Sequence, residues 1–183
     1  MNTHRRNRWP RRAALAAALI AAGPAWALDE RYDDLQASVE VAPVFSLSLS
    51  NPHLEFHQLS PGNTYTIGEG GFYNEVRCRS NNGRPWYLKA QLMSLRHVGM
   101  NASLPADALR WKAASVSGAG EPPSGRWDFE PFAERPVLIY ASRGEDERGR
   151  EVVLQFQYSL TCPLTAQAGD YIGQIIFTMA ESP

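Results

Sequence analysis

Cysteine and histidine, which supply much of the metal and redox chemistry of proteins, are scarce in this sequence. Its 183 residues include two cysteines and four histidines. No C-x-x-C spacing occurs, and no serine lies in a G-x-S-x-G setting that would predict a nucleophile. We find no Ser or Cys in a sequence motif that would pair it, as a nucleophile, with a general base. The sequence therefore predicts a protein that is not an enzyme and that uses no cofactor.

Long apolar runs are absent after residue 27. Residues 1–27 carry five arginines and no acidic residue, then an apolar run at 13–22, and then the small-x-small triplet Ala25-Trp26-Ala27. This order is typical of a signal peptide. The apolar run is too short to cross a bilayer, which takes about 20 residues, and no later segment approaches that length. We expect export by general secretion to the periplasm, the cell surface or the extracellular space, with no transmembrane segment once the leader is cleaved.

An excess of positive charge is also missing. Residues 28–183 carry 13 basic and 19 acidic residues, a net charge of about −6. A mildly acidic chain has no electrostatic reason to bind nucleic acid, so we expect no nucleic-acid partner. Its length is that of one domain, and we predict a single domain over residues 28–183.

Helical periodicity is absent outside the leader, whereas period-two alternation recurs along the chain. The clearest case is residues 152–160, where every second residue, from Val152 to Leu160, is apolar. Eight or nine such short runs, separated by turn residues, predict an all-β fold: an antiparallel immunoglobulin-like β-sandwich. Further strands are expected at 39–49 with a bend at Pro43, and then at 54–56, 65–67, 109–113, 137–140 and 171–179.

Residues 74–92 contain two alternating runs joined by a polar turn. The turn residues at 80–83 include two asparagines and a glycine, which tolerate the backbone of a reversal. Trp86 and Leu88 then begin the second run, and we expect Trp86 near the centre of the β core. Between residues 96 and 134 the pattern weakens, which predicts long surface loops that could carry a binding function.

The two cysteines, Cys78 and Cys162, both fall on the apolar phase of their runs. In an oxidising compartment an isolated pair is most simply a disulfide, which would stabilise the fold by about 4–5 kcal/mol in the chain-entropy model. Two buried free thiols are the alternative. We predict the disulfide.

Two other sets of residues are candidate sites. His53, Glu55 and His57 share one face of an expected strand and could hold zinc or copper, although alternate strand residues lie about 6.6 Å apart, which favours a solvated polar row. Trp111 and Trp127, together with Phe129, could form an aromatic platform for sugar. A strand tryptophan is more often buried in a core.

The segment from Val76 to Ala90, V-R-C-R-S-N-N-G-R-P-W-Y-L-K-A, resembles the first signature of bacterial WxL-type surface domains, with Trp86 and Leu88 as its Trp-x-Leu. The chain end from Ala168 resembles the closing strand of that family, including Tyr171, with Phe177 and Met179 in place of the second Trp-x-Leu. About 35 residues match well. The cysteine pair and the arginine-rich leader depart from the pattern. The resemblance implies a secreted sandwich that associates with a cell-wall polymer or with an envelope protein, with these five residues in its core.

We therefore expect an exported, non-enzymatic binding module of the cell surface or periplasm, whose site would be the loops at 96–134 or an exposed sheet edge. One alternative is a fimbria-like subunit that assembles by strand addition at a sheet edge, which would require an exposed apolar groove. A carbohydrate-binding module is a second alternative, and its sign would be an exposed Trp111 or Trp127.

Overall fold

The computed structural model describes residues 38–122 and 128–183, and its compact unit is Glu40–Pro183. The predicted leader at residues 1–27 and the candidate ligand-binding residue Trp127 lie outside the described residues. Within those residues, no helix has the length and apolar character needed to cross a membrane.

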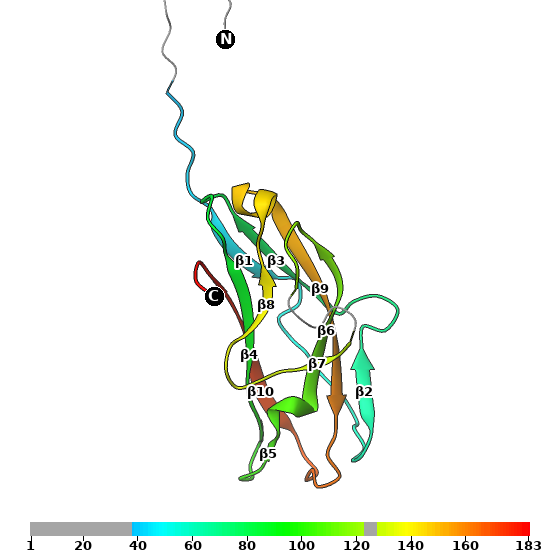
Figure 1. Cartoon of the computed structure of the whole chain (residues 1–183). Helices are drawn as coiled ribbons and strands as arrows, with labels where there is room; N and C mark the ends of the chain where they lie inside the picture. The colour runs from blue at the N-terminus through cyan, green and yellow to red at the C-terminus, as the bar shows by residue number, and fades with distance from the viewer. Residues whose placement is uncertain (1–37, 123–127) are drawn as a thin grey trace, which may run out of the picture. The chain divides into compact units, whose positions relative to one another are not determined.

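The described part of the chain is all-β, with ten strands and two short 3-10 helices (Figure 1). The strands form two antiparallel sheets packed as a β-sandwich, which confirms the predicted fold class; the immunoglobulin-like type stays a prediction. The elements are β1 (Phe45–Leu49), β2 (Thr64–Ile67), β3 (Asn74–Ser80), β4 (Tyr87–His97), β5 (Ser103–Leu104), η1 (Ala106–Ala108), β6 (Leu109–Ser117), β7 (Glu130–Pro131), β8 (Val137–Ala141), η2 (Gly144–Arg148), β9 (Glu151–Thr161) and β10 (Tyr171–Ala180).

The first sheet is built around β9, the most regular alternating run in the sequence. On one edge β9 pairs first with β3 and then with β2, and on the other edge it pairs with β6. The outer positions belong to β1, which pairs with β3, and to β7, which pairs with β6. This order leaves β1 as an edge strand.

The second sheet is built around β4. One edge of β4 pairs with β10 along nearly its whole length, and the other edge pairs with β8 and then with the short β5. A bulge interrupts the β4–β10 ladder opposite Gly173. A Cβ atom at Gly173 would lie 2.7 Å from the Leu95 side chain and 2.9 Å from the Met93 carbonyl oxygen, so the bulge requires a glycine there.

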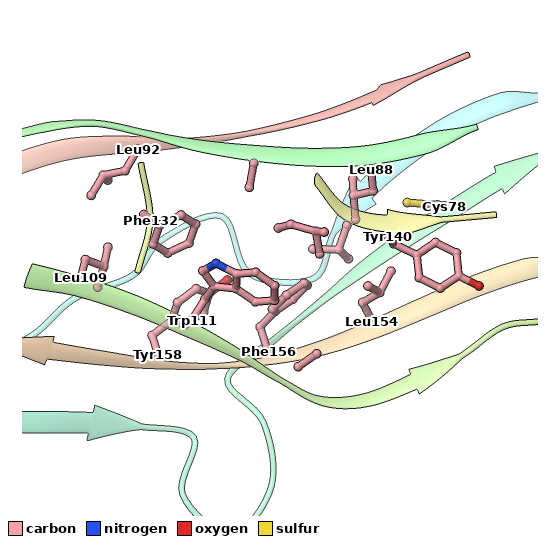
Figure 2. Packing of buried hydrophobic residues seen from close by; sticks show 14 of the residues in the cluster. Cys78, Leu88, Leu92, Leu109, Trp111, Phe132, Tyr140, Leu154, Phe156 and Tyr158 are labelled. Carbon is pink, nitrogen blue, oxygen red and sulfur yellow. The ribbon is translucent and has the colours of Figure 1, made fainter. Parts of the chain in front are cut away.

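The core lies between the sheets and is rich in aromatic side chains. Figure 2 shows Trp111 between the layers, with Phe132, Phe156 and Tyr158 around it. The ring centroids of Trp111 and Phe156 are 5.8 Å apart, and all four side chains are buried. The inward residues of β9 come from its alternating apolar phase, so the pattern that predicted this strand also builds the core.

The two runs predicted at 74–92 form β3 and β4, but the strands do not pair with each other, because they belong to different sheets. The connecting residues bond mainly to other elements. The Gly83 N–H donates to the Glu147 carbonyl in η2, and the Trp86 N–H donates to the Ser142 hydroxyl. These bonds fix the segment that connects one sheet to the other.

Trp86 is completely buried, as predicted, but it lies where β4 begins and not at the centre of the core. Its ring packs on Tyr140 with centroids 5.5 Å apart, and its Nε1–H donates to the Asp146 carbonyl at 3.1 Å. Trp111 takes the central position instead.

Two strand predictions near the start of the domain are also corrected. The first strand begins only at Phe45, and residues 54–56 form no strand. Leu54 and Phe56 still pack against the core, but from a loop. This loop is held by single hydrogen bonds, such as the one that the Tyr73 hydroxyl donates to the His53 carbonyl. It does not pair with β9, because β2 and β3 together pair along the edge of β9 opposite β6.

Candidate binding groove between two sheet edges

A groove of about 360 Å³ runs between β1 and β10. Within the described residues, β1 pairs only with β3 and β10 pairs only with β4, so each is the edge of its own sheet. The lining residues are Leu47, Ser48 and Leu49 of β1 and Gln174, Ile175, Ile176 and Phe177 of β10. One side of the sandwich is therefore bounded by two sheet edges with a hollow between them.

The apolar side chains of β1 face the interior but are not covered. Phe45 and Leu49 stand opposite Ser80 and Val76 of β3, both buried. Directly opposed residues of an antiparallel pair share a face, so Phe45 and Leu49 point between the sheets. Nevertheless 43% of Phe45 and 38% of Leu49 is exposed. The interior of the sandwich is open on this side.

The backbone of β1 presents hydrogen-bonding groups to the same opening. The Val44 carbonyl accepts from Asn81, and the Ser50 N–H donates to Glu75, so residues 44 and 50 bond toward the β3 side. In an antiparallel ladder successive residues bond to opposite sides. The N–H and C=O groups of residues 45, 47 and 49 therefore point to the free edge, as a docking strand would need.

Of the β10 residues that carry the resemblance noted in the sequence, Tyr171 lies at the start of the strand, away from this groove, whereas Phe177 lies beside the groove. Phe177 lines it, and its ring contacts the Phe156 ring at 5.7 Å between centroids. Tyr171 and Met179 are partly buried and pack against the core. Trp86 and Leu88 are completely buried. All five residues contribute to the core, those of β10 from an edge strand.

A buried polar cluster closes the end of the sandwich near Trp86. The Asp146 carboxylate accepts hydrogen bonds from the Tyr140 hydroxyl at 2.6 Å and from the backbone N–H groups of Ala119 at 3.0 Å and Gly120 at 2.9 Å. Asp146 is completely buried. These bonds tie the loop after β6 to η2 and β8, so the cluster is part of the fold and leaves no free group for a ligand.

Burial and hydrogen bonding act on the Asp146 carboxyl in opposite directions. Burial alone raises its pKa, but the hydrogen bonds from Tyr140, Ala119 and Gly120 favour the ionised form more strongly, and its pKa lies below the usual value. Burial, with the bond to Asp146, raises the pKa of the Tyr140 hydroxyl, which stays protonated as a donor.

The predicted disulfide is wrong: Cys78 and Cys162 are buried free thiols. Cys78 stands opposite Val152 near the start of β9, whereas Cys162 follows the last residue of that strand. Ten residues of extended chain separate 152 from 162, or about 33 Å at 3.3 Å per residue. Disulfide geometry requires Cα atoms within about 7 Å.

The three candidate metal ligands do not come together. Glu55 and His57 form an exposed pair with Oε2 and Nε2 3.3 Å apart, and both side chains are mostly exposed to solvent. His53 is exposed in the same loop, where its backbone, not its ring, makes the contacts. Among residues 38–122 and 128–183, no group of three or more His, Cys, Asp or Glu side chains could hold a metal ion.

Trp111 is not an exposed sugar platform, because only 1% of its surface is accessible. Its position in β6, one strand from the centre of the first sheet, turns its ring into the core. Phe129 instead lies near the Lys112 ammonium group, which is 5.8 Å from the ring centroid. Of the platform residues, Trp127 alone lies outside the described residues.

The region at 96–134, which the sequence predicts as the binding surface, contributes β6 to the interior of a sheet. Part of it lines a second hollow of about 270 Å³ at the far end of β10, with residues 102–105 on one side and residues around Ala166 on the other. An exposed sheet edge was the other expected place for a binding site, but that β1 and β10 would form it was not predicted. Its apolar residues were visible in the sequence, but their exposure depends on which strands are edges, and no local pattern carries that information.

Comparison with protein-family models, curated proteins and solved structures found no match to this chain.

Proposed function

We propose that this protein is an exported, non-enzymatic binding module that holds an extended segment of a protein partner in the groove between β1 and β10. The observation that carries the proposal is the exposure of Phe45 and Leu49, which point into the sandwich but lack a covering strand. A strand placed there would cover these side chains and pair with the free backbone groups of β1.

The chemistry of the groove favours a protein segment over a cell-wall polymer. Its lining is mainly aliphatic and aromatic, with Ser48 and Gln174 as the polar residues. A strand with alternating apolar residues matches both the side chains and the backbone of such an edge. A sugar chain needs many polar partners and stacking faces, and the buried Trp111 provides no such face.

The sequence supports the location and the class of this module. The leader-like residues 1–27 favour export, and the resemblance to WxL-type domains favours association with envelope proteins at the cell surface or in the periplasm. Both remain predictions. The fimbria-like alternative uses the same groove, since it requires strand addition at an exposed apolar edge.

Hydrogen exchange tests the proposal with a synthetic strand. The probe is a peptide of four Thr-Val repeats with a lysine at each end, added to the chain expressed from its full sequence. We expect slower exchange of the Leu47 and Leu49 amides, which face the free edge, and of amides in β10. An aspartate in the groove should oppose binding, so Leu49→Asp is expected to weaken the peptide affinity at least tenfold.

The matched control is Ser46→Asp, which adds the same charge to the same strand on its outward face, opposite Arg79. It should leave the protection unchanged. Protection confined to elements other than β1 and β10, or equal loss of binding in both variants, would exclude the groove as the site.

A further inference from the structure

The segment that precedes β1 has the pattern of a strand but is not paired in the described residues. Residues 35, 37, 39 and 41 are Leu, Ala, Val and Val, and they alternate with Gln, Ser, Glu and Ala. In the part that the structure describes, 83% of Val39 and 76% of Val41 is exposed. Isolated exposed valines are common, but two exposed valines at period two have the pattern of a strand with one face to bury.

This segment is poorly placed to fill the groove of its own chain. It runs directly into β1, so it would have to reverse within residues 42–44 to lie back along the free edge of that strand. Those residues are held instead by the Asn81 side chain, whose Nδ2–H donates to the Ala42 carbonyl at 3.0 Å and whose Oδ1 accepts from the Val44 N–H at 2.6 Å. The groove and the segment are therefore better matched between copies.

We propose that the occupant of the groove is the segment at residues 35–42 of a second copy of this chain. This inference rests on the proposed function, because it names the partner of the same groove. Leu35, Ala37, Val39 and Val41 would face inward and cover Phe45 and Leu49. The polar residues between them would face outward, alongside the outward-facing Ser46 and Ser48 of β1.

The contact is heterologous, since one copy supplies the segment and the other supplies the groove. Each copy then retains one unused segment or groove, so association continues head to tail instead of stopping at a dimer. The protein becomes the repeating unit of a linear assembly, joined by backbone pairing at a sheet edge.

Sedimentation of the chain expressed from its full sequence tests this inference. We expect oligomers whose length grows with concentration. The double variant Val39→Asp and Val41→Asp should need at least a tenfold higher concentration for the same average length, because charge would enter an apolar groove. The control double variant Gln36→Asp and Ser38→Asp adds the same charge on the outward phase, and it should assemble like the wild type.

Mixing two defective variants distinguishes head-to-tail pairing from other association. The Val39→Asp/Val41→Asp variant keeps an intact groove, and Leu49→Asp keeps an intact segment. Each should be monomeric alone, and the mixture should form a one-to-one heterodimer that grows no further. A mixed disulfide is expected between one copy that carries Glu40→Cys and another that carries Ser48→Cys, because both positions lie on the outward face of adjacent strands in the proposed pairing. Each copy is otherwise wild type, so this readout does not depend on the stability of the aspartate variants.

The inference is overturned if the wild-type chain stays monomeric at high concentration, or if oligomers persist in the Val39→Asp/Val41→Asp variant. It is also overturned if the two defective variants form no heterodimer and the cysteine variants form no mixed disulfide. If the chain is monomeric but the Thr-Val peptide protects β1 and β10, the groove still binds an extended protein segment, and only the identity of the occupant is wrong. If the peptide gives no such protection, the proposed function fails as well.

Discussion

The polar cluster around Asp146 shows how a carboxylate is tolerated inside this sandwich. The Tyr140 hydroxyl and two backbone amides donate to it, and the backbone approaches closely enough that two glycines are needed. A Cβ atom at Gly118 would lie 2.1 Å from the Tyr140 hydroxyl oxygen, and one at Gly120 would lie 2.0 Å from the Ala141 carbonyl oxygen. The loop after β6 is thus held by hydrogen bonds to the Asp146 carboxylate and by close packing that only glycine allows at residues 118 and 120.

Replacement of Asp146 by asparagine should destabilise the fold and change its response to acid. The amide would present N–H groups to existing donors, and we expect a loss of about 3 kcal/mol in the free energy of unfolding at neutral pH. The folded-state pKa of Asp146 is lowered, so its contribution is present above the unfolded pKa of about 3.9 and is lost as the pH falls through the folded value. Urea unfolding at pH 7 and pH 3 measures both effects.

The difference in the free energy of unfolding between wild type and Asp146→Asn should therefore be smaller at pH 3 than at pH 7. Glu145→Gln removes a neighbouring exposed carboxylate, and it should leave the stability at pH 7 within about 0.5 kcal/mol of wild type. A constant difference at both pH values would show that the charge of Asp146 has no part in the stability of the cluster.

The free thiols give a second prediction at the residue scale. Burial raises the pKa of the Cys78 thiol to about 12, so almost none of the reactive thiolate is present at neutral pH. We expect Cys78 to resist alkylation in the native protein. After unfolding without reductant, both Cys78 and Cys162 should be alkylated, and mass spectrometry counts the added groups. A chain that takes up the reagent only after reduction would contain the disulfide that the structure lacks.

At the scale of single elements, several strands were predictable from the sequence, because their apolar residues recur at every second position or form a short run. Residues 152–160 lie within β9, residues 137–140 within β8, and residues 171–179 within β10. Their period is fixed by the geometry of a strand with one buried face, so the information is local. Residues 54–56 show the limit, since they alternate in burial yet pair with no strand.

The pairing of the elements was not predictable, because it depends on residues far apart in the chain. The turn predicted at 80–83 does not bring its two strands together: its residues bond to Val44, just before β1, and to η2, and β3 and β4 enter different sheets. The disulfide prediction was wrong for the same reason. The alternating pattern correctly placed both cysteines on the buried face, but it does not say that Cys78 lies opposite the start of β9 and that Cys162 follows its end. The candidate groove is likewise a property of which strands become edges.

At the scale of the whole domain, the open side between β1 and β10 is the feature that links fold to function. An exposed sheet edge is usually blunted by charge, proline or a covering element. The lining of this groove contains no charged residue and no proline. The domain therefore has a free backbone edge and an apolar lining that one more strand could cover, and the segment before β1 is the strand that we propose for it.

A strand supplied within the same molecule should close the domain and end its association. The design keeps the full chain, replaces Val39 and Val41 by aspartate, and appends a short Gly-Ser turn and a second copy of residues 35–43 after Pro183. The tail can fold back along the free edge of β10 and place its valines over the groove. We expect a monomer whose Tm is about 5 °C above that of the same variant without the tail, because the added strand covers apolar surface at the cost of ordering a short segment. Thermal unfolding and sedimentation measure the two effects. A control tail that carries aspartate in place of both valines should leave Tm unchanged; an equal rise with either tail would mean that the tail acts without entering the groove.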